Sequence, residues 1–325
     1  MIRIVMLAVV LFVPVRAEAA PCTAASAACS EWVGLGHGPA RARVYRSFPL
    51  DARNESIRRA LIVVHGTNRD AQADYLAALA AAGLAHALDD TIVVAPRFAS
   101  NSGLVAGCAD RLAPREINWP CDGNSWRAGG AAGASTLTSF DFADEILQRL
   151  AAREVFPNLQ AIVVAGHSAG GQFVTRYEMA NQVHDTLGIP VTYVVANPSS
   201  YAYPDAARPA PARPCANYNT WPYGLENRRG YAARESASQL TKQLVARPTT
   251  YLLGELDVLP NVGFDASCAA MAQGATRLAR GEAYAAVMQK LGARHEVTIV
   301  PRCGHEARCM YTAKVVLPVL FPRVQ

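Results

Sequence analysis

The sequence is poor in lysine and has no long apolar run beyond its first residues. Lysine occurs only as Lys242, Lys290 and Lys314, so arginine carries almost all of the positive charge. The formal net charge of +5 is small for 325 residues and does not indicate a nucleic-acid partner. No segment after residue 20 is long and apolar enough to predict a membrane helix. No internal repeat or linker divides the chain, which favours one domain over residues 20–325.

The N-terminus holds a short apolar segment between charged residues. Met1-Ile2-Arg3 precedes an apolar run from Ile4 to Val15, and an A-x-A pattern follows at residues 17–19. This arrangement is typical of a secretory signal peptide, and we predict cleavage after Ala19, with cleavage after Ala20 as the alternative. We therefore expect a signal peptide at residues 1–19, a secreted or periplasmic protein, and no stable membrane insertion after cleavage.

Eight cysteines follow the predicted signal peptide. An even number of cysteines in an exported chain favours disulfides. Spacing alone cannot fix the connectivity, but closure between near neighbours favours four pairs: Cys22–Cys29, Cys108–Cys121, Cys215–Cys268 and Cys303–Cys309.

Apolar runs alternate with helical patterns along the chain. Buried strands are predicted at 60–64, 91–95, 161–165, 190–197, 249–253 and 296–300, after an early strand at 42–48. Helices are predicted at about 71–88, 139–154, 171–180 and 268–291. The alternation predicts the α/β class, with one doubly wound, mostly parallel sheet. Residues 20–39 are expected to form an arm, and two long connections, at about 97–138 and 198–230, are expected to be lid-like insertions.

The pattern Gly166-His167-Ser168-Ala169-Gly170 joins the strand at 161–165 to a helix. A serine between strand and helix, with small residues two positions away on each side, is typical of a nucleophile elbow. The sharp turn lifts the hydroxyl clear of the sheet, and the start of the helix favours developing negative charge. We therefore predict that Ser168 is a nucleophile.

A serine nucleophile needs a base, and the base needs an acid to hold it. His305 follows the last strand by a short loop, whereas His295 lies before that strand, at the other end of the sheet. Asp257 follows the preceding strand, and Glu255, Asp265 and Asp205 are the alternatives. A metal cluster of Cys303, His305 and Cys309 is a further alternative, but its spacing matches no standard zinc pattern. We predict the order Ser168, Asp257, His305, with no metal and no cofactor.

Acyl transfer also needs two N–H donors for the oxyanion. The residue after the nucleophile supplies one donor in this motif class, here the backbone of Ala169. The loop His65-Gly66-Thr67-Asn68 follows an early strand and is placed to supply the other. We predict the Thr67 backbone N–H as second donor, with Asn68 as the alternative, and a buried structural role for His65.

These motifs together resemble a secreted α/β-hydrolase of the esterase, lipase and polyester-depolymerase kind. The resemblance covers residue 60 to the C-terminus and lies in HGTN at His65, GHSAGG at Gly166, GELD at Gly254 and CGH at Cys303. It implies the same roles for Ser168, Asp257 and His305. The His-Gly-Gly-Gly oxyanion pattern of some members is absent, and the two long insertions differ from the shortest members.

The sequence thus predicts a serine hydrolase that cleaves carboxylic esters through an acyl-enzyme, acting on a small-molecule, lipid or polymeric ester. A peptidase or amidase on the same fold, and a non-catalytic binding protein, are the alternatives. We expect a monomer. The candidate substrate contacts are Asn68, His167, Trp126, Tyr201 and Trp221.

Overall fold

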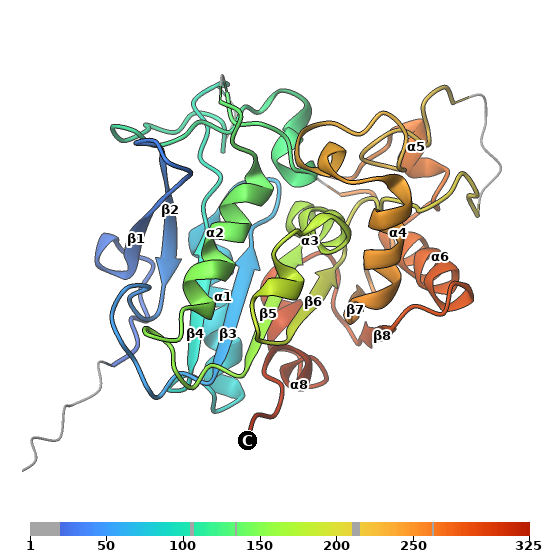
Figure 1. Cartoon of the computed structure of the whole chain (residues 1–325). Coiled ribbons are helices and arrows are strands. Elements are labelled where there is room, and N and C mark those ends of the chain that lie inside the picture. The colour runs from blue at the N-terminus through green and yellow to red at the C-terminus, as the bar shows by residue number, and fades with distance from the viewer. Residues whose placement is uncertain (1–19, 105–106, 134, 210–214, 262) are drawn as a thin grey trace, which may run out of the picture.

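A computed structural model describes residues 20–104, 107–133, 135–209, 215–261 and 263–325. The predicted signal peptide, residues 1–19, lies outside the described residues. The described chain forms an eight-stranded sheet with the order β1-β2-β4-β3-β5-β6-β7-β8 (Figure 1). The strands are β1 (Ser30–Gly34), β2 (Arg41–Arg46), β3 (Arg59–Val64), β4 (Thr91–Pro96), β5 (Ala161–His167), β6 (Val191–Ala196), β7 (Thr249–Gly254) and β8 (His295–Val300).

The sheet is mostly parallel, as predicted. The strands β4, β3, β5, β6, β7 and β8 run parallel to one another, and β2 pairs antiparallel with both β1 and β4. All six residues of β4 are buried, and five of six are buried in β3, because helices cover both faces of a doubly wound sheet. The α/β fold class predicted from the alternating pattern is therefore confirmed.

Helices form a layer on each face of the sheet (Figure 1). One hydrophobic cluster includes residues of α2, α3, α4 and α6, and the other includes residues of α1, α7 and α8. The α-helices are α1 (Ala71–Leu84), α2 (Ser139–Ala151), α3 (Ala169–Ala180), α4 (Ala237–Ala246), α5 (Cys268–Met271), α6 (Arg277–Lys290), α7 (Ala307–Thr312) and α8 (Leu317–Leu320). Short 3-10 helices are η1 (Ala27–Cys29), η2 (Asp122–Ala128), η3 (His184–Thr186) and η4 (Gly230–Arg234). Among the described helices, none is long and apolar enough to cross a membrane.

Two of the predicted elements have a different structure. The predicted arm contains β1, which extends the sheet through β2. The single helix predicted at 268–291 is two helices, because Gly274 lies at φ +146° and the Thr276 side chain accepts a hydrogen bond from Ala279 to begin α6. The break turns α6 so that its first residue, Arg277, lies beside Asp257.

Four disulfides connect all eight cysteines, in the pairs that near-neighbour closure predicts. Three of them close loops beside the carboxyl ends of the strands, where the insertions lie. Cys108–Cys121 lies within the first insertion, and Cys215–Cys268 ties the second insertion to α5. Cys303–Cys309 brackets the loop that carries His305. The disulfides therefore constrain the irregular segments that the sheet does not hold.

Candidate active site

Ser168 lies in a strained turn between β5 and α3. Its backbone adopts φ +59° and ψ −117°, a conformation that a non-glycine residue rarely takes. The turn is possible because its neighbours lack side chains. A Cβ at Gly166 would overlap the Gly170 carbonyl, and a Cβ at Gly170 would overlap the Val64 carbonyl. The two glycines of the motif are thus required by packing, and they present the Ser168 hydroxyl at the carboxyl edge of the sheet.

His305 and Asp257 extend from Ser168 as a chain of hydrogen bonds. His305 Nε2 lies 2.9 Å from Ser168 Oγ, and His305 Nδ1 lies 2.8 Å from Asp257 Oδ2. The carboxylate can only accept, so Nδ1 carries the proton and Nε2 accepts the hydrogen bond from the serine hydroxyl. The Asp257 side chain is fully buried and that of His305 is 9 % exposed. Residues from three separate strand ends therefore meet in the order that general-base activation of a serine requires.

The alternative acids and bases contact other partners. Glu255 accepts a hydrogen bond from the backbone of Arg302, and Asp205 accepts one from the backbone of Ala207. Asp265 accepts a hydrogen bond from the Tyr223 hydroxyl at 2.8 Å. His295 bonds the Tyr251 hydroxyl through Nδ1 and lies at the start of β8, away from Ser168. The contacts of these residues leave Asp257 and His305 as the pair beside the serine.

The loop that carries His305 is held from two directions. The Cys303–Cys309 disulfide brackets it, so these sulfur atoms are not available as metal ligands. Asn197, at the end of β6, donates a hydrogen bond to the Gly304 carbonyl at 3.1 Å and accepts one from the Gly254 N–H at 2.8 Å. The Asn197 amide thus joins the end of β7, near the acid, to the loop of the base. Sequence reasoning did not single out Asn197.

Arg277 is a second partner of Asp257 that sequence reasoning missed. Its Nη1 lies 3.4 Å from Asp257 Oδ1 and 2.5 Å from Asn261 Oδ1, and its Nε donates to Ser199 Oγ at 2.7 Å. Both side chains of the ion pair are fully buried. Burial lowers the pKa of Arg277, but the Asp257 carboxylate opposes that shift. The arginine therefore supplies positive charge on the side of Asp257 that faces away from His305.

The hydroxyl of Ser168 opens into a cavity of about 420 Å³, which we call the serine pocket. It is lined by Gly66, Thr67, Asn68, Asp70, Ala73, Asp74, His167, Ser168, Asn261 and His305. The His167 ring packs 4.6 Å from the His305 ring, and burial lowers the pKa of His167 well below its usual value. His167 is therefore a neutral wall of the pocket.

Asp74 is a titratable residue in the lining of the serine pocket. Burial raises the pKa of Asp74 to about 7, although a hydrogen bond from the Gly66 backbone favours its charged form. Its Oδ1 atom is buried and has no hydrogen-bond partner among the described residues. The cavity has space for a small acyl or alcohol group next to the Ser168 hydroxyl, with one wall whose charge changes near neutral pH.

Two backbone N–H groups are available near the nucleophile. No described residue accepts a hydrogen bond from the N–H of Thr67 or of Ala169. Thr67 lines the serine pocket, and Ala169 begins α3 directly after Ser168. A Cβ at Gly66 would lie 3.7 Å from Ser168 Cβ, an ordinary contact, so the spacing between these two residues does not require a glycine. The fixed donors match what an oxyanion site requires.

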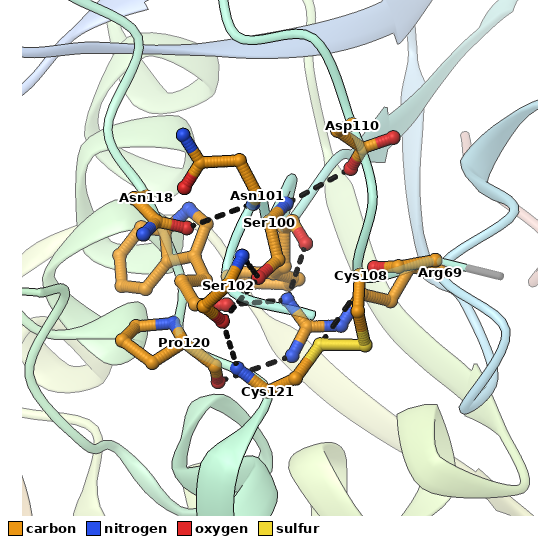
Figure 2. Close-up of a disulfide and its surroundings, with 12 residues drawn as sticks. Arg69, Ser100, Asn101, Ser102, Cys108, Asp110, Asn118, Pro120 and Cys121 are labelled. Carbon is orange, nitrogen blue, oxygen red and sulfur yellow. Dashed lines mark hydrogen bonds between the residues drawn. A yellow bond between two sulfur atoms is a disulfide. The ribbon is translucent and has the colours of Figure 1, made fainter. Parts of the chain in front are cut away.

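Arg69 anchors the loop of Thr67 to the first insertion. Its guanidinium donates to the carbonyls of Phe98 at 2.9 Å, Trp119 at 2.6 Å and Pro120 at 3.2 Å. Figure 2 shows this guanidinium facing Pro120 beside the Cys108–Cys121 disulfide. The first insertion is thus a support for the candidate oxyanion loop.

His65, the first residue of the same loop, has the buried structural position that was predicted. It is fully buried, and burial lowers its pKa to about 3. Its Nδ1 donates to the Gly66 carbonyl at 2.9 Å, while its Nε2 accepts a hydrogen bond from the Phe98 N–H at 3.2 Å. The neutral ring therefore also connects the loop to the first insertion.

The predicted substrate contacts divide into three groups. Asn68 and His167 line the serine pocket. Trp126 and Tyr201 do not: they are 1 % and 0 % exposed, and they pack in the hydrophobic core, with the Trp126 ring 4.8 Å from that of His65. These two predictions are corrected, because a buried ring in the core cannot meet a substrate. Trp221 lines a different cavity, described below.

No group of three or more His, Cys, Asp or Glu side chains that could hold a metal ion occurs among the described residues. The groups around Ser168 are those of proton transfer and acyl transfer. The arrangement can remove a proton from Ser168, stabilise the resulting imidazolium, and hold negative charge on a bound carbonyl oxygen.

The eight-stranded sheet and the strand-to-helix elbow define the α/β-hydrolase fold. The chain belongs to the alpha/beta hydrolase family, whose model matches residues 61–316. A comparison with curated proteins finds no match.

Two solved structures have a similar fold, each with a TM-score of 0.62, 23 % identity and 90 % of this chain covered. One is LpqC, a poly(3-hydroxybutyrate) depolymerase from Bordetella parapertussis, of which 91 % is covered. The other is poly(aspartic acid) hydrolase-1 from Sphingomonas sp. KT-1, of which 97 % is covered. At this level of identity the likeness concerns the fold.

Proposed function

We propose that the protein is a serine hydrolase that cleaves carboxylic esters through an acyl-enzyme. The observation that carries the proposal is the chain of hydrogen bonds from Ser168 Oγ through His305 to Asp257, at 2.9 Å and 2.8 Å. A hydroxyl with a base at hydrogen-bond distance, and a base held by a buried carboxylate, is the arrangement that activates serine for acyl transfer.

The reaction proceeds in two halves. His305 Nε2 takes the proton of Ser168 Oγ as that oxygen attacks the ester carbonyl carbon, and Asp257 stabilises the imidazolium. The N–H groups of Thr67 and Ala169 bind the oxyanion, and each donor of this kind is worth about 3 kcal/mol. His305 then gives its proton to the leaving alcohol. In the second half, water activated by His305 attacks the acyl carbonyl and releases Ser168.

We propose that the protein acts outside the cytoplasm, as a monomer. The signal-peptide pattern at residues 1–19 and the pairing of all eight cysteines both support export, because disulfides persist in oxidising compartments. N-terminal sequencing of the exported protein should begin at Ala20. A mature chain that retains Met1 would contradict this part of the proposal.

The test of the catalytic proposal is the kinetics of Ser168→Ala with p-nitrophenyl esters. Loss of the nucleophile should lower kcat/KM by about 10⁴-fold or more. Near wild-type turnover would show that another group performs the chemistry. Running p-nitroanilides in parallel distinguishes an esterase from an amidase, because the same groups can cleave both bonds.

A further inference from the structure

A second cavity, of about 430 Å³, lies close to Ser168 and holds no group that the proposed reaction uses. We call it the arginine pocket; its lining is Gly123, Ser125, Arg127, Ala128, Gly130, Gln172, Arg176, Trp221, Pro222, Tyr223, Arg229 and Asp265. Gln172 connects it to the nucleophile, because its N–H donates to the Ser168 carbonyl at 3.0 Å in the first turn of α3. One turn of helix is about 5.4 Å along the axis. The wall of this cavity therefore begins one helical turn from the nucleophile.

Arg176 brings a buried positive charge to the arginine pocket. The residue is 1 % exposed, and its guanidinium donates to the carbonyls of Pro222 and Arg127 and to Ser200 Oγ, at 3.0 to 3.2 Å. All three partners are neutral, and no described carboxylate lies within ion-pair distance of Arg176. Burial and the nearby charge of Arg127 lower the pKa of Arg176, whereas Tyr223 and the more distant Asp265 carboxylate oppose that shift. A buried charge surrounded by neutral acceptors is unfavourable unless an anion joins it.

Arg127 adds a second guanidinium that also lacks an ion-pair partner among the described residues. Its Nη1 donates to Gln172 Oε1 at 2.9 Å, and the Gln172 amide is fixed by Ser200 Oγ at 2.5 Å. The remaining donors of Arg127 have no described partner. Glutamine and serine thus hold Arg127 and Arg176 on one cavity wall without neutralising them.

The rest of the lining leaves the positive charge in excess. Asp265 is the one carboxylate among the lining residues, and it already accepts hydrogen bonds from Tyr223 Oη at 2.8 Å and the Ser267 N–H at 3.1 Å. Arg229 is exposed and makes no described ion pair. Other buried arginines either pair with a carboxylate, as Arg277 does with Asp257 at 3.4 Å, or bond only neutral acceptors, as Arg280 does with the Gly274 and Ser199 carbonyls. The arginine pocket differs from both because its arginines line a cavity.

We propose that the arginine pocket binds a carboxylate of the substrate, so that the enzyme prefers esters with an acidic group a few carbons from the scissile bond. This inference rests on the proposed esterase function. The planar guanidinium of Arg127 suits a carboxylate, with Arg229 at the exposed side and Arg176 behind it. The indole of Trp221, whose Nε1 donates to the Ala128 carbonyl at 2.9 Å, forms an apolar wall for the connecting carbons.

The kinetic test compares p-nitrophenyl hemiglutarate, which bears a carboxylate, with neutral p-nitrophenyl hexanoate. The wild type should have the higher kcat/KM for the hemiglutarate. Arg127→Gln should lower the ratio of the two kcat/KM values about tenfold, because it removes a charged donor, and Arg229→Gln about threefold. Arg323→Gln changes an exposed arginine next to Pro322, whose carbonyl contacts Arg59 at the start of β3, and should leave the ratio as it is.

The outcomes separate the two proposals. A wild type that hydrolyses the hexanoate but prefers it, or a ratio that neither arginine variant changes, overturns the carboxylate subsite and leaves the esterase intact. Absence of turnover with either ester overturns the proposed function.

Glutarate binding to the Ser168→Ala protein, measured by calorimetry, tests the subsite without catalysis. Binding that weakens in Ser168→Ala/Arg127→Gln supports it, and no binding overturns it. Since Arg229 is exposed, Arg229→Gln also serves if Arg127→Gln fails to fold.

Discussion

The serine pocket and the arginine pocket border α3 at Ser168 and at Gln172, and they are built in different ways. The proposed reacting groups of the serine pocket follow the ends of β5, β7 and β8, which hydrogen bonding within the sheet fixes. The arginine pocket takes most of its lining from the two insertions, and α3 contributes Gln172 and Arg176. The sheet therefore positions the proposed catalytic groups, and the insertions supply most of the lining of the proposed carboxylate subsite.

The two pockets also treat charge in opposite ways. In the serine pocket, the charges behind the reaction are paired, because Asp257 meets both His305 and Arg277. In the arginine pocket, Arg127 and Arg176 meet neutral side chains and carbonyls. The ion pairs of Asp257 fix the position of the catalytic groups, whereas Arg127 and Arg176 are available to bind an anionic ligand. The following predictions test this difference, from the largest effect to the smallest.

Asp257→Asn should lower kcat by about 10⁴-fold, to the same extent for the anionic and the neutral ester. The amide cannot stabilise the imidazolium and can hold the wrong tautomer of His305. Steady-state kinetics with both esters measure the effect. Glu255→Gln is the matched control, since that neighbouring carboxylate bonds the Arg302 backbone and should leave kcat within about twofold. A loss of kcat for only one of the two esters would show that Asp257 also affects substrate recognition, against the proposed division of roles between the two pockets.

Arg69→Gln should lower kcat about ten- to a hundredfold for both esters, with little change in KM. The variant loses the hydrogen bonds to Phe98, Trp119 and Pro120 that hold the loop of Thr67, and a misplaced oxyanion donor costs part of its full effect. Separate values of kcat and KM show whether the transition state is affected. Arg53→Gln, an exposed arginine paired with Glu55, is the control. If KM rises while kcat is kept, Arg69 acts on substrate binding instead.

Raising NaCl from about 50 to 500 mM should lower kcat/KM about threefold for the hemiglutarate ester and much less for the hexanoate. Salt screens the attraction between the exposed side of the arginine pocket and an anion, whereas the buried pair of Asp257 and Arg277 is shielded from it. Equal salt dependence for the two esters would show that the arginine pocket does not meet the substrate.

The pH dependence of stability should differ between Asp74 and Asp265. Because the pKa of Asp74 is raised to about 7, the folded state keeps a proton that the unfolded state has released, and the free energy of unfolding falls between about pH 4 and pH 7. Asp74→Asn should remove that part of the decline, worth about 5 °C in Tm between pH 4.5 and 7.5. Thermal unfolding at both pH values measures it, and an unchanged decline in the variant would contradict the account.

Asp265 should show the opposite sign. Burial alone would raise its pKa, but hydrogen bonds from Ser267 and Tyr223 outweigh burial and lower it. A lowered pKa contributes stability above the usual range of an aspartate, and that contribution is lost as the pH falls through the folded-state pKa. Asp265→Asn should therefore be less stable than the wild type at pH 7.5, with a gap that narrows near pH 3. A gap that widens on acidification would reverse the assignment.

Much of the fold and of the candidate site could be predicted because it follows local patterns. Apolar runs give the parallel strands, and the glycines around Ser168 give the elbow. Asp257 and His305 could be proposed because each follows a strand, and the carboxyl ends of parallel strands meet at one edge of the sheet.

The supporting residues could not be predicted, because they depend on contacts between distant segments. Arg277 reaches Asp257 only because Gly274 breaks the expected helix, and Asn197 joins loops that are 50 residues apart, at Gly254 and Gly304. Arg176 did leave a signal: it lies in a helix whose other residues are buried, and a charge there demands a partner. The two aromatic residues Trp126 and Tyr201 were wrongly predicted as substrate contacts. An aromatic ring suits the core as well as a binding site, and both of these rings are in the core.

Ser168 is the proposed nucleophile of an ester hydrolase, and covalent labelling can identify an activated serine. The mature protein is treated with a fluorophosphonate, digested and mapped by mass spectrometry. We expect one adduct, on the peptide that contains Ser168, and none in Ser168→Ala, because His305 at 2.9 Å activates that hydroxyl. An unlabelled wild type, or an adduct on another residue, would contradict it.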